Sequence, residues 1–113
     1  MTREFVRLPN FENCWKRCGL TEEALAELAI ALCSNPKLGD VVQGTGGLRK
    51  LRWALPYKGK SGSVRVVYVD FAVFEKIYFI SAYAKNEKDN ITANEKKNIK
   101  KLIGMLESEL RKK

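Results

Sequence analysis

The sequence predicts a single α+β domain over residues 1–113: a small antiparallel sheet, made of one N-terminal strand and a three-strand meander, with two N-terminal helices and one C-terminal helix. Three observations predict it. Apolar residues have helical spacing between residues 9 and 34, alternate among β-branched residues between 48 and 84, and return to helical spacing after 92. A chain of 113 residues with 45% hydrophobic content buries about two-thirds of its unfolded surface, so folding requires no metal or disulfide.

The first third of the chain predicts a short strand and two helices. The strand spans Arg3–Leu8, and the first helix follows it, with Asn10 as N-cap and Gly19 as the stop. The apolar face of this helix consists of Phe11, Cys14, Trp15 and Cys18. The second helix starts at the N-cap Thr21 and ends before Pro36. Its apolar stripe consists of Leu25, Leu28, Ala29 and Leu32.

Three strands are expected after Gly39, where the period changes from helical to alternating. They span Leu48–Leu55, Val64–Phe71 and Lys76–Ala84 and form an antiparallel meander with short connections. The middle strand, VRVVYVDF, is apolar at nearly every position. This pattern is typical of a central strand that is covered on both faces.

A last helix is expected from Thr92, which forms a capping box with Glu95. Its apolar side consists of Ile99, Leu102, Ile103, Leu106 and Leu110. Its other side is basic and includes Lys96, Lys97, Lys100 and Lys101. This basic side fits contact with RNA, contact with an acidic protein segment, or a solvated helix face.

The charge balance favours a polyanionic partner. The chain has 21 Lys and Arg against 13 Asp and Glu, a net charge of +8, which suits nucleic acid, anionic lipid or an acidic protein. No apolar run reaches the roughly 18 residues of a membrane span, and no secretory leader is recognisable. Three cysteines, an odd number, fit a reducing cytoplasm.

Cys14 and Cys18 have the i, i+4 spacing of half a metal site. The chain has no histidine and no second cysteine pair, so we interpret them as buried thiols and expect no metal site.

Two glycine-containing stretches look like phosphate-binding loops but lack the required context. Gly59, Lys60 and Ser61 match the end of a Walker A loop, yet Ala54 stands where that loop needs a glycine, and a strand follows. A strand also follows the glycines at 44, 46 and 47, so no helix N-terminus is available for a pyrophosphate. These glycines are expected to give the backbone freedom at the entrance to that strand.

Residues 41–69 form a block with no acidic residue. Its six cations are Arg49, Lys50, Arg52, Lys58, Lys60 and Arg65. Because a solvated sheet face usually mixes signs, this block predicts a surface that binds an anion. Aromatic residues lie among or near the cations and could stack on unpaired bases, namely Trp53, Tyr57, Tyr68 and Tyr83. For Trp53, a place in the core is the favoured interpretation.

The last strand adds a second group of candidate residues. Tyr83 and Lys85 fall on the same face of that strand, and Arg65 lies on the neighbouring strand. Together they form a candidate cluster for phosphodiester cleavage. The turn AVFEK is expected to expose Val73 and Phe74, where a polar hairpin turn is the simpler expectation, and we interpret the pair as a contact surface.

Three segments in this order, NPKLGDVVQGTGGLRKLRWA, GKSGSVRVVYV and YAKNEKDNIT, resemble the RelE superfamily of bacterial type II toxin-antitoxin systems, in particular its HigB-like branch. The resemblance covers Asn35 to about Lys101. It implies a toxin that enters the ribosomal A site and cleaves mRNA, and that a cognate antitoxin holds inactive. It also implies a cytoplasmic toxin that is monomeric alone, needs no cofactor, and meets operator DNA only through a helix-turn-helix antitoxin.

The resemblance carries site roles over to the residues in matching motifs. It implies catalytic roles for Arg65 in VRVVY, for Tyr83 and Lys85 in YAKNE, and for Lys60. Among the other cations of the block, the resemblance covers Lys50 and Arg52. The charge of the block predicts RNA binding by Arg49, Lys50, Arg52 and Lys58. No metal ligand is implied.

Cleavage by the RNA 2′-hydroxyl needs a base, an acid and a stabiliser for the charge on phosphorus. Without histidine, lysine and tyrosine must transfer the protons, and neighbouring cations lower the pKa of both residue types toward neutrality. The alternative is a binding module in which the same cations hold RNA or DNA without cleaving it. A neutral partner-binding domain is disfavoured by the charge.

Overall fold

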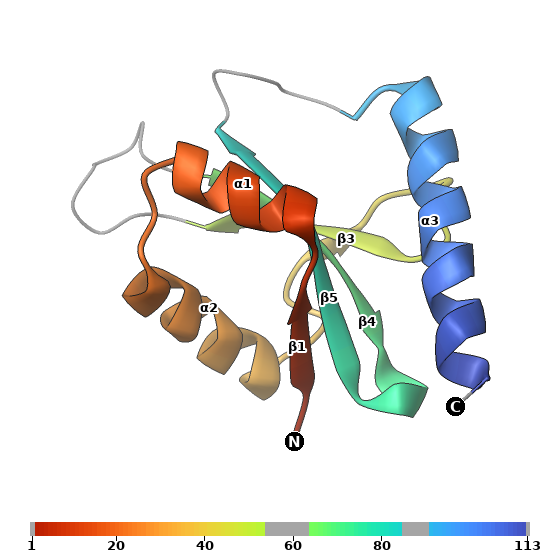
Figure 1. The fold of residues 1–113 in the computed structure, drawn as a ribbon, viewed down its shortest axis with the longest axis horizontal. Coiled ribbons are helices and arrows are strands. Elements are labelled where there is room, and N and C mark those ends of the chain that lie inside the picture. The colour runs from red at the N-terminus through yellow and green to blue at the C-terminus, as the bar shows by residue number, and fades with distance from the viewer. Residues whose placement is uncertain (1, 54–63, 85–90, 113) are drawn as a thin grey trace.

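A five-stranded sheet with helices on both faces forms the centre of the structure (Figure 1). The computed structural model describes residues 2–53, 64–84 and 91–112. The elements in chain order are β1 (Glu4–Arg7), α1 (Pro9–Arg17), α2 (Glu22–Ser34), β2 (Asp40–Val41), β3 (Leu48–Trp53), β4 (Val64–Phe71), the 3₁₀ turn η2 (Ala72–Phe74), β5 (Lys76–Ala84) and α3 (Ala93–Arg111). The predicted α+β class is confirmed. Residues 54 and 55, the end of the first predicted meander strand, lie outside the described residues.

The strand order is β1-β5-β4-β3-β2, with β3, β4 and β5 as an antiparallel meander and β4 in the centre, as predicted. Two details differ from the prediction. The first strand pairs parallel to β5, so the sheet is mixed, because the chain returns through α1 and α2 before the meander begins. A fifth strand, β2, pairs with β3 over only two residues, which is too short to give a periodic signal.

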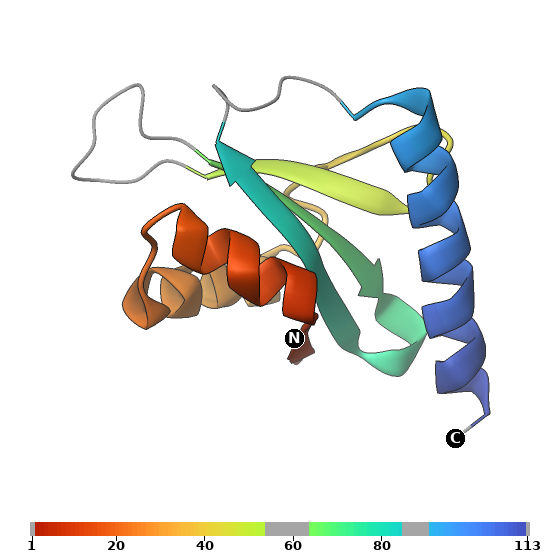
Figure 2. The same ribbon diagram turned by 45° about the horizontal axis from the view of Figure 1, so that its top comes forward.

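The helices divide between the two faces of the sheet. Figures 1 and 2 show α1 and α2 on one face and α3 on the other. β4 follows this division residue by residue: Val66 packs into the core under α1 and α2, whereas Val67 packs into the core under α3. Side chains on β4 therefore alternate between the two faces. A β-bulge opposite Val67 and Tyr68 shifts this alternation along β5, so that Phe79 and Ala82 lie in the same core.

The predicted helix ends are present in the structure, except for the N-cap of α1. Asn10 is not the N-cap of α1, because Leu8 holds that position and Pro9 occupies the first turn, where its missing N–H costs nothing. The Asn10 side chain instead donates to the Ile80 carbonyl at 3.3 Å. Gly19, with φ +76°, ends the helix as predicted. The predicted Thr21 cap and the capping box of Thr92 and Glu95 are both present.

Tyr68 fastens the loop before β2 to the sheet. It is fully buried under α1 and α2, donates to the Pro36 carbonyl at 2.9 Å and accepts from the Gly39 N–H at 2.8 Å. Gly39 fits here because a Cβ would lie 3.0 Å from both the Lys50 carbonyl oxygen and the Tyr68 ring. Tyr68 is thus not available for stacking on bases, whereas Trp53 packs against the same core as expected.

Tyr68→Phe is expected to reduce stability by about 1–3 kcal/mol, because it leaves the Pro36 carbonyl and the Gly39 N–H without their partner. Burial raises the pKa of Tyr68 in the folded protein. Its stabilising contribution is therefore fully present below about pH 10, the unfolded value, and is lost as the pH rises through the raised folded pKa. Urea unfolding at pH 8 and pH 10.5 measures both effects.

In this experiment the wild type should lose more stability than Tyr68→Phe between the two pH values. Tyr78→Phe is the matched control at pH 8, because Tyr78 is only partly buried on the other face, and it should change stability by less than about 0.5 kcal/mol. Equal losses on alkalisation in wild type and Tyr68→Phe would contradict the account.

Candidate functional site

Three predicted site residues lie in one row across the sheet. In the strand register Arg52 of β3 is opposite Arg65 of β4, and Arg65 is opposite Tyr83 of β5. Directly opposed residues point to the same face, with Cβ atoms about 5 Å apart. Tyr83 packs into the core under α3, so the whole row faces α3. We call Arg52, Arg65 and Tyr83 the cationic row.

Lys50 belongs to the same face, and Arg49 does not. Lys50 lies two residues from Arg52 and opposite Val67, whose side chain packs under α3. Arg49 directly precedes Lys50 on the strand and points to the α1 and α2 side, where its Nη1 donates to the carbonyls of Gly39 at 2.7 Å and Lys37 at 3.5 Å. The structure thus separates Arg49 from the other cations. Lys58, Lys60 and Lys85 lie outside the described residues.

Arg65 is the residue of the row whose environment points to a ligand. Its side chain is partly buried, and Nη1 is shielded from solvent with no hydrogen-bond partner among the described residues. A buried charged N–H is costly unless an acceptor meets it. A phosphate oxygen is an acceptor of the required charge, and the guanidinium fork suits its geometry.

Tyr83 is buried, whereas a catalytic group on the sheet surface is expected to be exposed. Only 7% of its surface is exposed, and its ring packs in the core under α3. The ring is therefore a packed wall of the site, and it fixes the position of the strand that stands beside Arg65.

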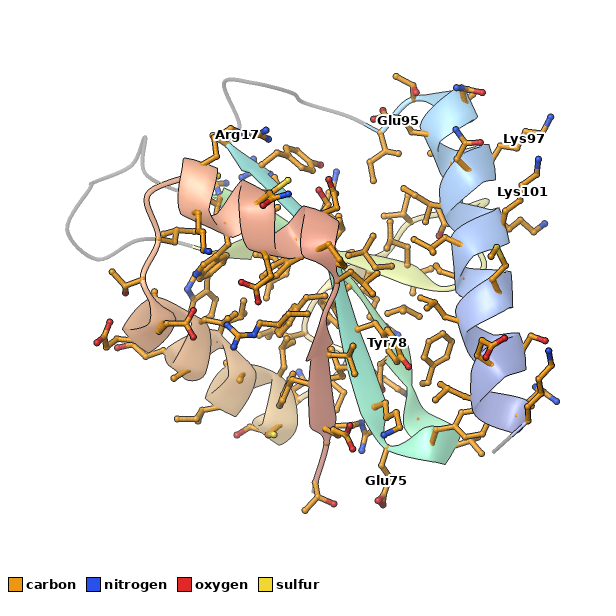
Figure 3. All side chains as sticks on the ribbon, in the orientation of Figure 1. Arg17, Glu75, Tyr78, Glu95, Lys97 and Lys101 are labelled. Carbon is orange, nitrogen blue, oxygen red and sulfur yellow. The ribbon has the colours of Figure 1, made fainter. Side chains whose placement is uncertain are left out.

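Arg17 is a further cation near this end of the sheet, and no motif in the sequence indicates it. Its exposed side chain extends from the last turn of α1 toward the end of β5 (Figure 3). Its Nη2 lies 3.7 Å from the Cys14 sulfur. The sequence places Arg17 on a helix but contains no signal for how α1 crosses β5.

A hollow of about 390 Å³ adjoins the cationic row on the same face, between the start of α1, the β4–β5 pair and the first half of α3. It is lined by Leu8, Asn10, Val67, Ile80, Ser81, Glu95, Asn98, Ile99 and Leu102.

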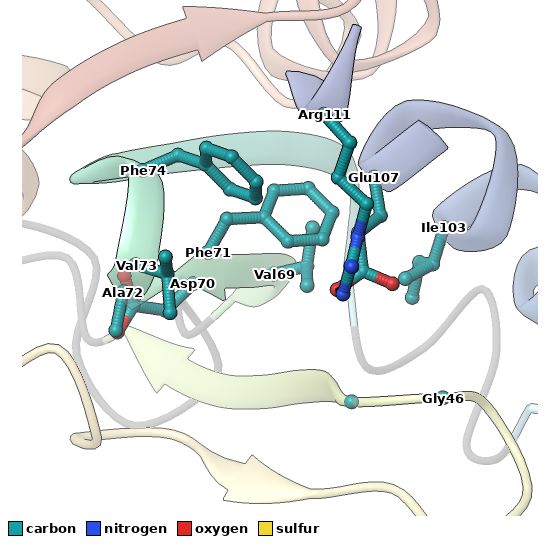
Figure 4. A pocket seen from close by; sticks show the side chains of 11 residues that line it. Gly46, Val69, Asp70, Phe71, Ala72, Val73, Phe74, Ile103, Glu107 and Arg111 are labelled. Atoms are coloured by element: carbon teal, nitrogen blue, oxygen red, sulfur yellow. The ribbon is translucent and has the colours of Figure 1, made fainter. Parts of the chain in front are cut away.

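A second hollow, of about 370 Å³, lies at the opposite end of β4 (Figure 4). Phe71, Phe74 and Ile103 line it, with the ion pair of Glu107 and Arg111 at 3.5 Å beside them. Val73, at its edge, is 90% exposed. Val73 is exposed as expected, whereas Phe74 is only partly exposed, because its side chain packs against the core under α3. That the turn is a contact surface stays a prediction.

Two of the lysines of α3 point away from the sheet. Figure 3 shows Lys97 and Lys101 directed outward from the helix, and in the described part of the chain neither forms an ion pair closer than 4.0 Å. The three interpretations of this face all stay open.

The cysteines are consistent with thiols rather than ligands. Cys14 is buried, and its sulfur lies 3.6 Å from the Ser81 hydroxyl oxygen, whereas Cys18, which was also expected to be buried, is partly exposed. Within residues 2–53, 64–84 and 91–112, no three His, Cys, Asp or Glu side chains come together as a metal site would need. None of the described helices combines the length and the apolar character that crossing a bilayer requires.

Comparison with known proteins identifies the family. Residues 7–113 match the family described as the RelE toxin of the RelE / RelB toxin-antitoxin system. The chain belongs to the RelE toxin family. Among solved structures, a double mutant of the E. coli toxin RelE in the free state is similar, with a TM-score of 0.57 and 15% sequence identity over 79% of this chain and 90% of that one. This likeness supports the RelE fold, and the family match makes the chain a toxin of a toxin-antitoxin system.

Proposed function

We propose that this RelE-family toxin is a ribosome-dependent endoribonuclease that cleaves mRNA in the ribosomal A site by attack of the RNA 2′-hydroxyl, without a metal ion. The observation that carries the proposal is the buried Nη1 of Arg65, which has no hydrogen-bond partner in the part of the chain that the structure describes. Arg65 lies between Arg52 and Tyr83 on one face of the sheet. The family match supports the toxin role. The proposal about chemistry depends on the cationic row.

The row suits the charge that develops in this reaction. The 2′-oxygen attacks the adjacent phosphorus, the 5′-oxygen leaves, and the products are a 2′,3′-cyclic phosphate and a 5′-hydroxyl. Arg65 donates to the non-bridging oxygens, where negative charge grows in the transition state. Arg52, exposed on the neighbouring strand, neutralises a flanking phosphate.

Proton transfer is assigned to lysine and tyrosine. Tyr83 is the described member of this group, and it lies opposite Arg65 in the strand register. Lys60 and Lys85 are the proposed lysines of this group, and both lie outside the described residues. Each member of the described row is a cation or a phenol, so the row supplies proton donors and positive charge rather than carboxylate ligands for a metal.

The proposal includes the partners of such a toxin. They are mRNA and ribosomal RNA in the A site, and a cognate helix-turn-helix antitoxin that links the toxin to operator DNA. The free toxin is a cytoplasmic monomer of the HigB-like branch that works without a cofactor.

Purified toxin is expected to cut a defined mRNA on programmed ribosomes and to leave 2′,3′-cyclic or 3′-phosphate and 5′-hydroxyl ends. These ends are expected because the attacking nucleophile is the 2′-oxygen of the RNA itself. The measurement is mass spectrometry of the fragments. The matched control is the same mRNA with one 2′-deoxynucleotide on the 5′ side of the cut, which should stay intact at that position.

Two results would contradict the proposal. Fragments with 5′-phosphate ends would show that water or hydroxide attacks instead of the 2′-oxygen. Intact mRNA that is nevertheless bound in a salt-dependent way would favour the non-catalytic binding module.

A further inference from the structure

We propose that the hollow between α1, β4–β5 and α3 holds one unstacked nucleobase of the RNA whose phosphate lies at Arg65, and that it selects a base with an exocyclic amino group. This inference rests on the proposed function, because it assigns the base pocket of the same site. We call the hollow the base pocket. Its relevant residues are Val67, Ser81, Glu95, Asn98 and Ile99.

The strand register places the base pocket next to the cationic row. After the pair Arg65 and Tyr83, the next pair on the same face is Val67 and Ser81, which lines the pocket. Two residues along a strand correspond to about 7 Å. A base and its phosphate are separated by one sugar, so a phosphate held at Arg65 brings a neighbouring base within reach of the pocket.

The size and the apolar surfaces of the pocket suit a flat ring. Its volume of about 390 Å³ lies in the range of roughly 300–1,000 Å³ that is usual for small-molecule sites. Val67 and Ile80 contribute apolar surface from the sheet, and Ile99 and Leu102 contribute it from α3. Proteins that read single-stranded RNA commonly hold an unstacked base between such surfaces and read its edge by hydrogen bonds.

The polar groups of the pocket can read a base edge. Asn98 is exposed, and its amide offers both a donor and an acceptor. The Glu95 carboxylate is held in place by the capping box, in which Oε1 accepts from the Thr92 N–H at 2.9 Å. A carboxylate offers only acceptors. It therefore favours the amino groups of adenine, cytosine or guanine over uracil, which has none.

The polar groups from the other side of the pocket are fixed in place. Asn10 donates to the Ile80 carbonyl at 3.3 Å, and the Ser81 hydroxyl oxygen lies 3.6 Å from the Cys14 sulfur. Because the Asn10 and Ser81 side chains already contact protein atoms, we assign the discrimination between bases to the polar groups of α3. The variants that test the inference are therefore on α3.

Two variants on α3 are expected to relax base preference while cleavage continues. Asn98→Ala removes the amide, and Glu95→Gln keeps the capping box, which accepts Glu or Gln, but adds a donor. Cleavage sites are mapped on ribosomes programmed with mRNAs that vary every base near the cut. The wild type should disfavour uracil at one position, and each variant should reduce that preference roughly fivefold or more, the lower end for one base-edge contact.

Asn94→Ala is the matched control, because Asn94 is an exposed asparagine one turn earlier on α3 that does not line the pocket. It should keep the wild-type preference. The inference is overturned if the wild type cuts without base preference, if Asn98→Ala and Glu95→Gln keep the wild-type preference, or if they slow cleavage equally at every sequence. These outcomes leave the proposed function standing, whereas a wild type that does not cut removes both.

A binding measurement tests the pocket without cleavage. The four ribonucleoside 3′-monophosphates are titrated into ¹⁵N-labelled toxin, and the side-chain amide signal of Asn98 is followed. The adenosine, cytidine and guanosine compounds should shift this signal more than the uridine compound does. Ser81→Leu, which fills the pocket, should remove the shift. Equal shifts with all four, or shifts that survive Ser81→Leu, would overturn the inference.

Discussion

Arg65→Ala is expected to abolish growth inhibition when the toxin is expressed without its antitoxin. The substitution removes the buried Nη1 donor that meets the phosphate in the proposed transition state. Loss of one such donor typically costs about 3 kcal/mol of transition-state stabilisation, or a hundredfold or more in rate. Growth curves of inducible strains measure the effect, and circular dichroism of purified protein confirms that the variant is folded.

Two companions make this experiment specific. Arg65→Lys keeps the charge but loses the guanidinium fork, so it should keep part of the toxicity. Lys112→Ala removes one exposed cation at the far end of α3 and should stay fully toxic. A folded Arg65→Ala variant with undiminished toxicity would contradict the proposed role of Arg65.

Phe79→Ala is expected to cost about 3–5 kcal/mol of unfolding free energy, the usual penalty for a large cavity in a core. Only 1% of Phe79 is exposed, and its ring stacks on Phe5 at 5.6 Å and on Phe11 at 4.8 Å. The ring thus connects β5 to β1 and to α1. Because domains of this kind are stable by only about 5–15 kcal/mol, the variant should lose much of its stability. Urea unfolding followed by circular dichroism measures this loss.

Val73→Ala is the control for this prediction. Val73 is also apolar and belongs to the turn that leads into β5, but it is 90% exposed, so its truncation should change stability by less than about 0.5 kcal/mol. A loss below about 1 kcal/mol for Phe79→Ala would show that the aromatic contacts do not hold β1 and α1 on the sheet.

Much of the fold could be predicted from the sequence because its signals are local. Alternation and β-branched residues define β4 and β5 to their last residues, and Thr92 with Glu95 marks the start of α3. The parallel pairing of β1 depends on where α1 and α2 return the chain, and the N-cap of α1 depends on Pro9. The pairing of β1 is therefore decided by tertiary packing. The start of α1 is decided by the preference of proline for the first turn of a helix, which overrides the preference of Asn10 for the N-cap.

The candidate site was predicted less completely, and the reason lies in strand geometry. A charge block indicates that cations are close in sequence, but neighbours on a strand point to opposite faces. Arg49 and Lys50 are therefore separated, although they are adjacent. The cross-strand pairing of Arg52, Arg65 and Tyr83 depends on register, which only the structure supplies. Arg17 and the base pocket depend on how helices cross the sheet.

The role of the cationic row is tested by comparing arginines on the two faces of the sheet. Single-turnover cleavage of mRNA on programmed ribosomes is measured for Arg65→Ala, Arg52→Ala and Arg49→Ala, each checked for folding. We expect a rate loss of about a hundredfold or more for Arg65→Ala, a smaller loss for Arg52→Ala, and a near wild-type rate for Arg49→Ala, because Arg49 lies on the other face. A larger loss for Arg49→Ala than for Arg65→Ala would contradict it.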